Sequence, residues 1–252
     1  MLTPIQRFSN RVENYVRYRP GYPAGLIEVL RQECGLTGDS VVADIGSGTG
    51  KLTELLLNTG CAVLAVEPNP EMRAAGERLR QRFPRFLSVA ATAEATTLGP
   101  GSVELITAGQ AFHWFDRPRA RAEFMRILRP GGSVALIWND RRTDATPFLK
   151  AYEKLLRDFA TDYEQVNHRN IDFTMLREFF GTEPRLVKFP YSQLFDFAGL
   201  QGRLLSSSYA PERGQPKHEA MLRSLRQIFD EHQRGGEASF DYDTLVYHGR
   251  LG

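Results

Sequence analysis

A glycine-rich loop after a short apolar segment is the feature that most restricts the fold of this 252-residue chain. The segment VVADI, residues 41–45, is followed at once by GSGTG and then by a helix-like spacing of Leu52, Leu55 and Leu56. Glycines at such a junction let the backbone turn sharply from a strand into a helix, and they let a ligand approach without a Cβ in the way. The helix N-terminus that follows offers unpaired N–H groups to an anionic ligand group. We therefore expect a strand–loop–helix unit with a ligand at the loop.

The first half of the chain repeats this alternation of short strands and helices. Apolar runs predict strands over residues 41–45, 62–66, 86–91, 103–108 and 133–138. Helical spacing between them predicts helices over 70–82 and 117–128. Short apolar strands that alternate with helices indicate a parallel sheet covered on both faces, which places the chain in the α/β class.

The alternation changes after Asn139. Phe148, Tyr152, Leu155 and Phe159 belong to an apolar stripe at helical spacing, which predicts an amphipathic helix. A short helix near 173–180, a strand over 185–197, a long helix around 221–229 and a closing strand over 240–251 are expected to follow. The chain is predicted to be a single domain, 1–252, with residues 141–183 inserted as a helical cap over one edge of the sheet.

Composition excludes several other classes of protein. Lys plus Arg total 32 against 30 for Asp plus Glu, and a nucleic-acid-binding protein would normally carry a strong basic excess. No apolar run approaches the length of a membrane span, and the N-terminal residues lack the apolar core of a signal peptide. Cys34 and Cys61 have no metal-like or redox spacing. We expect a cytoplasmic protein without a metal, a nucleic-acid partner or a membrane.

The glycine spacing helps to choose between two cofactors. A dinucleotide-binding loop has the pattern G-x-G-x-x-G, whereas here Gly46, Gly48 and Gly50 follow G-x-G-x-G. Asp44 stands two positions before the first glycine; its carboxylate would repel a pyrophosphate and could attract an ammonium group. Glu67, at the end of the second strand, could bind ribose hydroxyls, but an acid there also serves NAD. The early glycine and Asp44 favour a zwitterionic ligand such as S-adenosylmethionine.

Ordered motifs along the chain carry a resemblance to a known family. DIGSGTG, AVEPNPEM, ATAEATTL, TAGQAFHWFD and LRPGG resemble the motifs of class I S-adenosylmethionine-dependent methyltransferases. YRPGYP, IWNDR and SSSYAP extend the likeness to the small-molecule subgroup that includes trans-aconitate methyltransferase. The resemblance implies a Rossmann-like, doubly wound, mostly parallel seven-stranded sheet with an antiparallel last strand. It also implies methyl transfer to a small organic acceptor.

The resemblance further implies a set of cofactor-binding residues. Residues 1–23 would form an arm over the cofactor. Many members of the family carry Gly-Asp or Gly-Thr before the Ala-Glu pair, whereas this chain has Ala91-Thr92. The implied cofactor-binding residues are Tyr15, Arg19, Asp44, Gly46, Ser47, Gly48, Gly50, Glu67, Pro68, Met72, Ala93, Glu94 and Gln110.

The stretch TAGQAFHWFD bunches three large aromatic residues and a histidine after the fourth strand. Ligands of open α/β sheets bind beyond the carboxyl ends of the strands, so this stretch is expected to stand between the methyl donor and the acceptor. His113 is the candidate catalytic residue, with a hydrogen-bond donor or a buried histidine as the alternatives. An ionised carboxylate acceptor would need no base, whereas a hydroxyl or an amine would need one.

The candidate substrate-binding residues are Phe112, Trp114, Arg141 and Tyr209. Arg141 and its neighbour Arg142 could hold an acidic substrate by paired hydrogen bonds, or could be solvated. We predict a methyltransferase whose acceptor is a small molecule, with a carboxylate as one candidate. The alternatives are a non-catalytic or regulatory S-adenosylmethionine-binding module and, less favoured by the glycine spacing, an NAD-dependent oxidoreductase.

Overall fold

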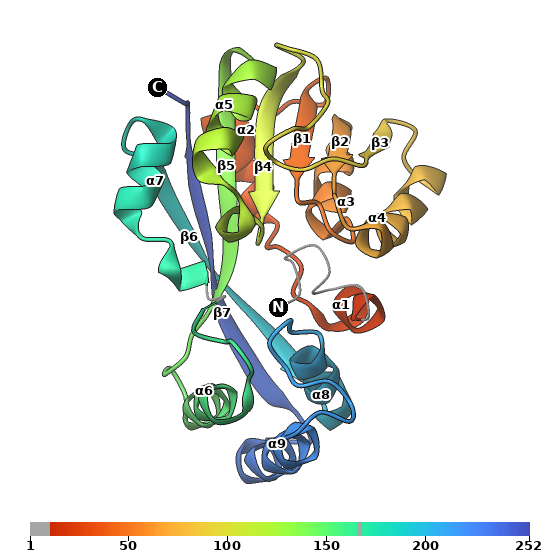
Figure 1. The fold of residues 1–252 in the computed structure, drawn as a ribbon, viewed down its shortest axis with the longest axis vertical. Helices are drawn as coiled ribbons and strands as arrows, with labels where there is room; N and C mark the ends of the chain where they lie inside the picture. Colours follow the sequence, from red (N-terminus) through yellow and green to blue (C-terminus); the bar gives the residue numbers. More distant parts are fainter. Residues whose placement is uncertain (1–10, 166–167) are drawn as a thin grey trace.

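Seven strands form one sheet in the computed structural model, which describes residues 11–165 and 168–252 (Figure 1). Their order across the sheet is β3-β2-β1-β4-β5-β7-β6. β7 pairs antiparallel with both β5 and β6, and the other pairs are parallel. The strands are β1 Val41–Ile45, β2 Ala62–Val66, β3 Phe86–Val89, β4 Val103–Gly109, β5 Leu128–Arg141, β6 Arg185–Phe195 and β7 Ala238–Gly249. The predicted α/β class, Rossmann-like topology and antiparallel last strand are confirmed.

The order of the strands reverses between β1 and β4. From β1 the chain moves outward through β2 to β3 and then returns to β4 on the other side of β1. Asp44 on β1 pairs with Thr107 on β4. A crevice forms outside the carboxyl ends of the strands at such a switch point, and ligands of open α/β sheets bind there.

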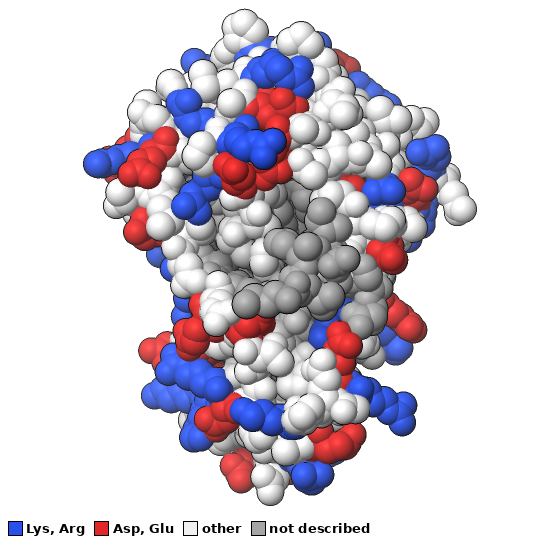
Figure 2. All heavy atoms as spheres, viewed as in Figure 1, with Lys and Arg blue, Asp and Glu red and all other residues white. Residues whose placement is uncertain are grey.

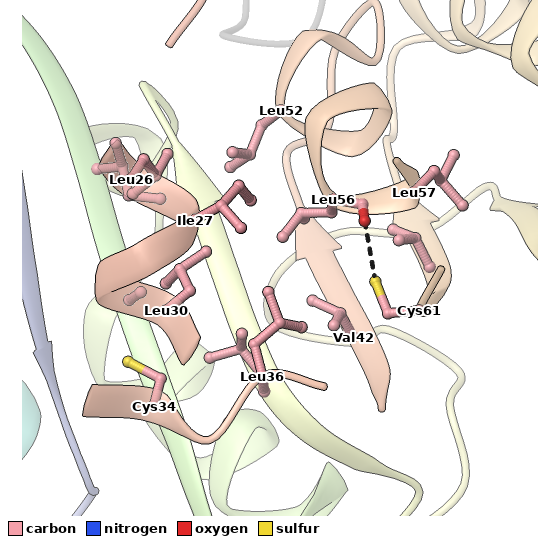
Figure 3. Packing of buried hydrophobic residues seen from close by; sticks show 14 of the residues in the cluster. Leu26, Ile27, Leu30, Cys34, Leu36, Val42, Leu52, Leu56, Leu57 and Cys61 are labelled. Carbon is pink, nitrogen blue, oxygen red and sulfur yellow. Dashed lines mark hydrogen bonds between the residues drawn. The ribbon is translucent and has the colours of Figure 1, made fainter. Parts of the chain in front are cut away.

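Helices cover both faces of the sheet around this point. On one face α2 Gly25–Cys34 and α3 Lys51–Leu57 pack their apolar side chains onto β1 and β2. Figure 3 shows Ile27 of α2 and Leu56 of α3 pointing toward one another in this layer. On the other face α5 Arg117–Ile127 and α7 Phe173–Phe180 pack against β4 and β5. The free Cys61 is buried in the first layer and its Sγ donates to the carbonyl oxygen of Leu56 at 3.3 Å (Figure 3).

Strands β5, β6 and β7 are long enough to extend past the other four. Their far ends carry three helices, α6 Pro147–Phe159, α8 Phe197–Leu205 and α9 His218–His232, which form a separate layer in Figure 1. Phe148, Leu204, Leu225 and Phe240 are central to a third apolar cluster between these helices and β7. We call α6, α8 and α9, with the strand ends they cover, the helical lobe.

The predicted cap, 141–183, divides between two places. Its first helix, α6, belongs to the helical lobe. Its second, α7, packs on the sheet beside α5, where Arg121 Nε donates to the Phe179 carbonyl oxygen at 2.8 Å. Residues 166–167 lie outside the described part of the chain. The helical lobe is thus assembled from three segments that are distant in sequence.

The described part of the predicted N-terminal arm begins at residue 11, and residues 1–10 lie outside the described residues. It forms α1, Val12–Tyr18, which packs on α8 of the helical lobe. The Arg11 guanidinium donates to the carbonyl oxygens of Leu205, Ser207 and Ala210 at 3.0, 2.7 and 2.7 Å. These bonds fasten the start of the arm to the end of α8.

Some boundaries differ from those predicted. The helix expected over 70–82 is α4, Pro70–Gly76, followed by a 3₁₀ turn, Glu77–Gln81. The strand expected over 133–138 extends to Leu128–Arg141 because it pairs with both β4 and β7. None of the helices in the described residues is both long enough and apolar enough to span a membrane.

Candidate functional site

The glycine loop between β1 and α3 takes a conformation that side chains would disfavour. Gly46, Gly48 and Gly50 have φ values of +68°, +56° and +83°, in the left-handed region that glycine adopts most readily. A Cβ on Gly46 would lie 2.5 Å from the Cβ of Ala111, and one on Gly50 would lie 2.7 Å from Leu79 Cδ1. The early third glycine of the motif is therefore favoured chiefly by its left-handed backbone conformation.

Glu67 at the end of β2 holds this loop in place. Its Oε2 accepts a hydrogen bond from the Gly48 N–H and its Oε1 accepts one from the Asn69 N–H, both at 2.8 Å. The N–H groups of Gly46 and Ser47 also bond to β2, at the Val66 carbonyl oxygen. Burial raises the pKa of Glu67, although the two backbone N–H groups oppose that shift. The carboxylate thus links two loops, and Glu67 lines a cavity together with Pro68.

Asp44, the other carboxylate of the site, is almost fully buried near the end of β1. The hydroxyl groups of Thr53 and Thr107 donate to its two oxygens at 2.6 and 3.0 Å. Burial raises the pKa of Asp44 to about 6, and the bonds from Thr53 and Thr107 reduce that shift. A cationic ligand group would favour the ionised form, because an opposite charge nearby lowers the pKa of a carboxyl group.

A cavity of about 250 Å³ opens on the Glu67 side of the loop, and we call it the Glu67 cavity. Pro68, Met72 and Ala93 give it apolar walls, and Asn69 caps α4 beside it by accepting from the Met72 N–H at 2.8 Å. Glu94 also lines it, and its Oε1 accepts from the Asp116 N–H at 2.9 Å. Pro68, Met72, Ala93 and Glu94, all predicted cofactor-binding residues, therefore line one cavity beside the Glu67 carboxylate.

A second cavity of about 140 Å³ lies between the loop and the helical lobe, and we call it the lobe cavity. Asp44 and Ser47 line it on the loop side, and Arg203 and Tyr209 line it on the lobe side. The two cavities adjoin, since they share the lining residues Tyr15, Gly46, Gly48, Gly109, Gln110 and Trp114.

Gln110 stands where the two cavities meet, directly after β4. Its φ is +58°, an uncommon conformation for a residue with a side chain. The backbone N–H donates to the Ile137 carbonyl oxygen and the side-chain amide to that of Asn139, at 2.8 and 3.1 Å. Asn139 in turn donates to Gly21 of the segment after α1 at 2.8 Å. The strained backbone of Gln110 is thus held by β5, and the arm is tied to the same strand.

The aromatic stretch that follows forms a 3₁₀ turn, Phe112–Trp114, and its members point to different places. His113 and Trp114 line the lobe cavity, with ring centres 4.8 Å apart. Phe112 is fully buried and packs edge-on against Phe179 of α7 at 4.6 Å. Phe112 was expected to contact the substrate, but it belongs to the apolar core. One turn of 3₁₀ helix directs consecutive side chains to different sides, so His113 and Trp114 can line the cavity while Phe112 does not.

The remaining predicted residues come together across the lobe cavity. Tyr15 and Arg19 reach it from the arm, Arg141 from the end of β5 and Tyr209 from the segment after α8. The Arg19 guanidinium lies over the Tyr15 ring at 5.1 Å. Arg142, by contrast, faces solvent and pairs with Asp243 at 2.7 Å. Successive residues near a strand end point to opposite faces, so only one of the two adjacent arginines reaches the cavity.

Sequence reasoning missed several residues that line the lobe cavity. Arg203 comes from the last turn of α8, Tyr163 lies in the connection after α6, and Arg169 lies in the short 3₁₀ helix His168–Asn170. None of these residues belongs to a motif. The one sequence signal is the spacing of three and four residues from Arg203 to Ser206 and Ser207, which places them on one face of a helix. Ser206 and Ser207 themselves are buried and bond to Arg203.

On the face drawn in Figure 2, the described residues show no comparable concentration of charge. Figure 2 shows acidic and basic side chains interspersed over the face in view. In the arginine-rich run of α5, Arg126 pairs with Glu123 at 2.7 Å, and Arg129 pairs with Glu104 just beyond the helix. Among the described residues, no three His, Cys, Asp or Glu side chains gather in a way that could hold a metal ion.

Comparisons with known proteins agree with this geometry. Residues 43–136 match the family model for a methyltransferase domain. A methyltransferase-like protein of Schizosaccharomyces pombe is 28% identical over 247 residues, which cover 96% of this chain and 94% of that protein. A methyltransferase of Mycobacterium tuberculosis is 41% identical over 134 residues, and this alignment spans 53% of the chain and about half, 52%, of the relative.

A solved structure from Anaeromyxobacter dehalogenans has the same fold, with a TM-score of 0.66 at 23% identity, covering 93% of this chain and 98% of that one. The matched residues 43–136 contain the glycine loop, Glu67 and the aromatic stretch. The sheet order and the matched domain together classify the molecule. The chain is a class I S-adenosylmethionine-dependent methyltransferase, and S-adenosylmethionine is its methyl donor.

Proposed function

We propose that the protein transfers the methyl group to a small organic acceptor that binds in the lobe cavity, while the adenosine part of the donor occupies the Glu67 cavity. The observation that supports this most strongly is the pair of adjoining cavities on either side of one glycine loop, each with its own buried carboxylate. The donor has a nucleoside at one end and an ammonium group at the other, and two adjoining cavities with one carboxylate each can bind the two ends separately.

The residues of this chain fit the donor. The three glycines leave backbone surface open where a Cβ would crowd the loop. Pro68, Met72 and Ala93 offer apolar contact to a flat ring, and Glu67 has lone pairs for ribose hydroxyls. Asp44 would attract the ammonium group, which would in turn stabilise its ionised form.

The bound donor supplies an electrophilic methyl group on a sulfonium sulfur. The protein's own contribution is to orient and to exclude water. Gln110 and Trp114 would form the shared wall where donor and acceptor meet. The Trp114 ring can stabilise a nearby cation by about 0.5–2 kcal/mol. Alignment of two groups in a site shielded from water can supply most of the rate enhancement of such a transfer.

His113 is the side chain in this wall that could accept a proton from the acceptor. It is needed as a base only if the acceptor is a hydroxyl or an amine. If the acceptor is a carboxylate, His113→Gln should leave the rate within a few fold of that of the unmodified protein. A loss of about 100-fold or more would assign a proton-transfer role.

The test of the proposed function is calorimetric titration with S-adenosylhomocysteine, with NADH as a parallel control. Micromolar or tighter binding at one site per chain, without an NADH signal, is the expected result. The Asp44→Ala and Glu67→Ala variants should bind at least tenfold more weakly. Failure of a folded sample to bind S-adenosylhomocysteine would refute the proposed roles of both cavities.

A further inference from the structure

Three arginine side chains gather on the lobe side of the lobe cavity, and they come from three different elements. Arg19 follows α1, Arg141 ends β5 and Arg203 lies in α8. Arg141 and Arg203 are 9% and 6% exposed. Their guanidinium carbons lie 5.8 and 5.4 Å from the centre of the same ring, that of Phe240. The fold therefore concentrates positive charge in one buried place.

Little negative charge compensates this cluster. Among the described residues, Glu153 is the one carboxylate that pairs with any of these three arginines, and it pairs with Arg141. Arg203 donates to the Tyr242 hydroxyl and the Ser207 hydroxyl, and Arg19 donates to the Ser206 carbonyl oxygen. These last partners are neutral. Removing cations from water is costly unless they are paired with anions, so the cluster as it stands has an excess of positive charge.

Two hydrogen-bond donors of the cluster have no acceptor. Arg141 Nη1 and Arg19 Nε are buried and have no hydrogen-bond partner among the described residues. A buried donor without a partner costs about 1–3 kcal/mol, and more when it is charged. A purely structural arginine would not require this cost, whereas an anionic ligand could accept from both.

Tyr209 reports the electrostatic potential inside the cluster. Its ring packs edge-on against the Tyr163 ring at 4.9 Å, and the Tyr163 hydroxyl accepts from Arg141 at 3.0 Å. Burial opposes ionisation of the Tyr209 phenol, but the charges of Arg203, Arg19 and Arg141 outweigh it and lower its pKa. The space beside Tyr209 therefore favours negative charge.

We propose that Arg19, Arg141 and Arg203 form a subsite for an oxyanionic group of the acceptor, a carboxylate or a phosphate, separate from the atom that is methylated. This inference rests on the proposed function of the lobe cavity. It makes the three arginines determinants of specificity. The positive charge of the bound donor adds to that of the arginines, so an uncharged or cationic acceptor would be disfavoured.

The test measures binding, independently of turnover, on protein saturated with S-adenosylhomocysteine. Succinate is titrated against its uncharged isostere succinamide, and inorganic phosphate is titrated in parallel. We expect one site per chain, with succinate or phosphate bound at least tenfold more tightly than succinamide. A preference for succinate assigns a carboxylate, and a preference for phosphate assigns a phosphate ester.

Three variants test whether oxyanion binding depends on these particular arginines rather than on the overall positive charge of the protein. Arg141→Lys retains a cation for Glu153 but removes the unpartnered Nη1, and Arg19→Gln removes the charge together with the unpartnered Nε. Each should weaken binding of the oxyanion at least tenfold, while Arg142→Lys, the matched control next to Arg141, should leave it unchanged. Thermal melts verify that each variant is folded.

The outcomes distinguish the two proposals. Binding of S-adenosylhomocysteine without any preference for an oxyanion over succinamide would overturn the subsite alone. Equal oxyanion affinity in all three variants would do the same. Failure of S-adenosylhomocysteine to bind would overturn the proposed function, and the assignment of the subsite to an acceptor would fall with it.

Discussion

At the scale of single residues, Asp44 stands out because its burial works against stability. Its pKa of about 6 lies above the ordinary value of 3.8 for an aspartate side chain. The folded protein therefore binds more protons than the unfolded chain between these values, and its stability falls as the pH rises through that interval. Above pH ~6 the ionised carboxylate costs the fold up to about 3 kcal/mol, at 1.36 kcal/mol per pKa unit.

Asp44→Asn should consequently stabilise the protein while it weakens binding of the donor. We expect the free energy of unfolding at pH 7 to rise by about 1–3 kcal/mol, and the gain to disappear below pH ~4, where the aspartate is protonated in both states. Urea denaturation at the two pH values measures this. Asp39→Asn, at an exposed position before β1, is the control. An unchanged or lower stability of Asp44→Asn at pH 7 would contradict the electrostatic argument.

The same group predicts how donor binding depends on pH. In the proposed site the donor's ammonium group would bind to the ionised form of Asp44, and protonation would compete with it below about pH 6. Affinity for S-adenosylhomocysteine should fall by up to about tenfold per pH unit below that value. Calorimetric titration between pH 5 and 8 tests this, and a flat profile would indicate that Asp44 does not contact the ligand.

Some site residues could be predicted from the sequence and others could not. The positions of Asp44, Glu67 and the glycines follow from strand ends and turn chemistry, which are local properties. Phe112 and Trp114 are equally aromatic and nearly adjacent, yet one lies in the core and the other lines both cavities. The direction of each depends on how the 3₁₀ turn meets α7, which comes about 60 residues later. No local pattern contains that information.

At the scale of elements, the loop between β1 and α3 depends on β2 through Glu67. Glu67→Gln keeps the size of the side chain but turns one acceptor into an N–H₂ donor, which would face either the Gly48 or the Asn69 N–H. We expect at least tenfold weaker binding of S-adenosylhomocysteine, together with a loss of stability of about 1–3 kcal/mol for the unsatisfied groups. Glu71→Gln, in the exposed first turn of α4, is the control. Unchanged affinity would show that the link between the two loops is dispensable.

The packing of α1 on α8 can be tested by a substitution at Gly202. A Cβ on Gly202 would lie 2.1 Å from Tyr18 Cε2, so Gly202→Ala must displace the arm. We expect faster cleavage near residues 11–19 in limited proteolysis, since an opened segment is cut more readily. In a Tyr18→Ala background the same substitution should have little further effect, because the clash is absent. Equal effects in both backgrounds would exclude this contact as the cause.

The sheet up to β5 could be predicted from the sequence more completely than the packing of the helical lobe. The alternating strands and helices up to β5 are each set by local apolar periodicity and by turns. The lobe combines α6, α8 and α9, and the apolar stripes of these helices indicate that each is buried without indicating against which partner. Periodicity likewise indicated α7 correctly as a helix, but its packing beside α5 is a tertiary choice.

At the scale of the whole molecule, β7 links the two halves. It pairs with β5 from Gly249 to Tyr242 and with β6 from His248 to Ala238. Its near end lies beside the core of the sheet, and its far end carries Phe240 in the core of the helical lobe. Unfolding of the lobe would remove a partner from the long strands, so we expect the halves to unfold together.

Leu225→Ala tests this cooperativity at a residue that lines neither cavity. Leu225 is fully buried on α9 in the helical lobe, and such a truncation costs about 2–5 kcal/mol. Trp114 and Trp138 lie on the sheet side, in the aromatic stretch and on β5, so tryptophan fluorescence follows the sheet while far-UV circular dichroism follows the helices of both halves. The two urea transitions should coincide and shift together to lower urea, whereas Arg223→Ala on the exposed face of α9 should shift neither appreciably. A dichroism transition that precedes the fluorescence transition would show that the lobe unfolds alone, and that the long strands do not transmit its loss to the methyltransferase sheet.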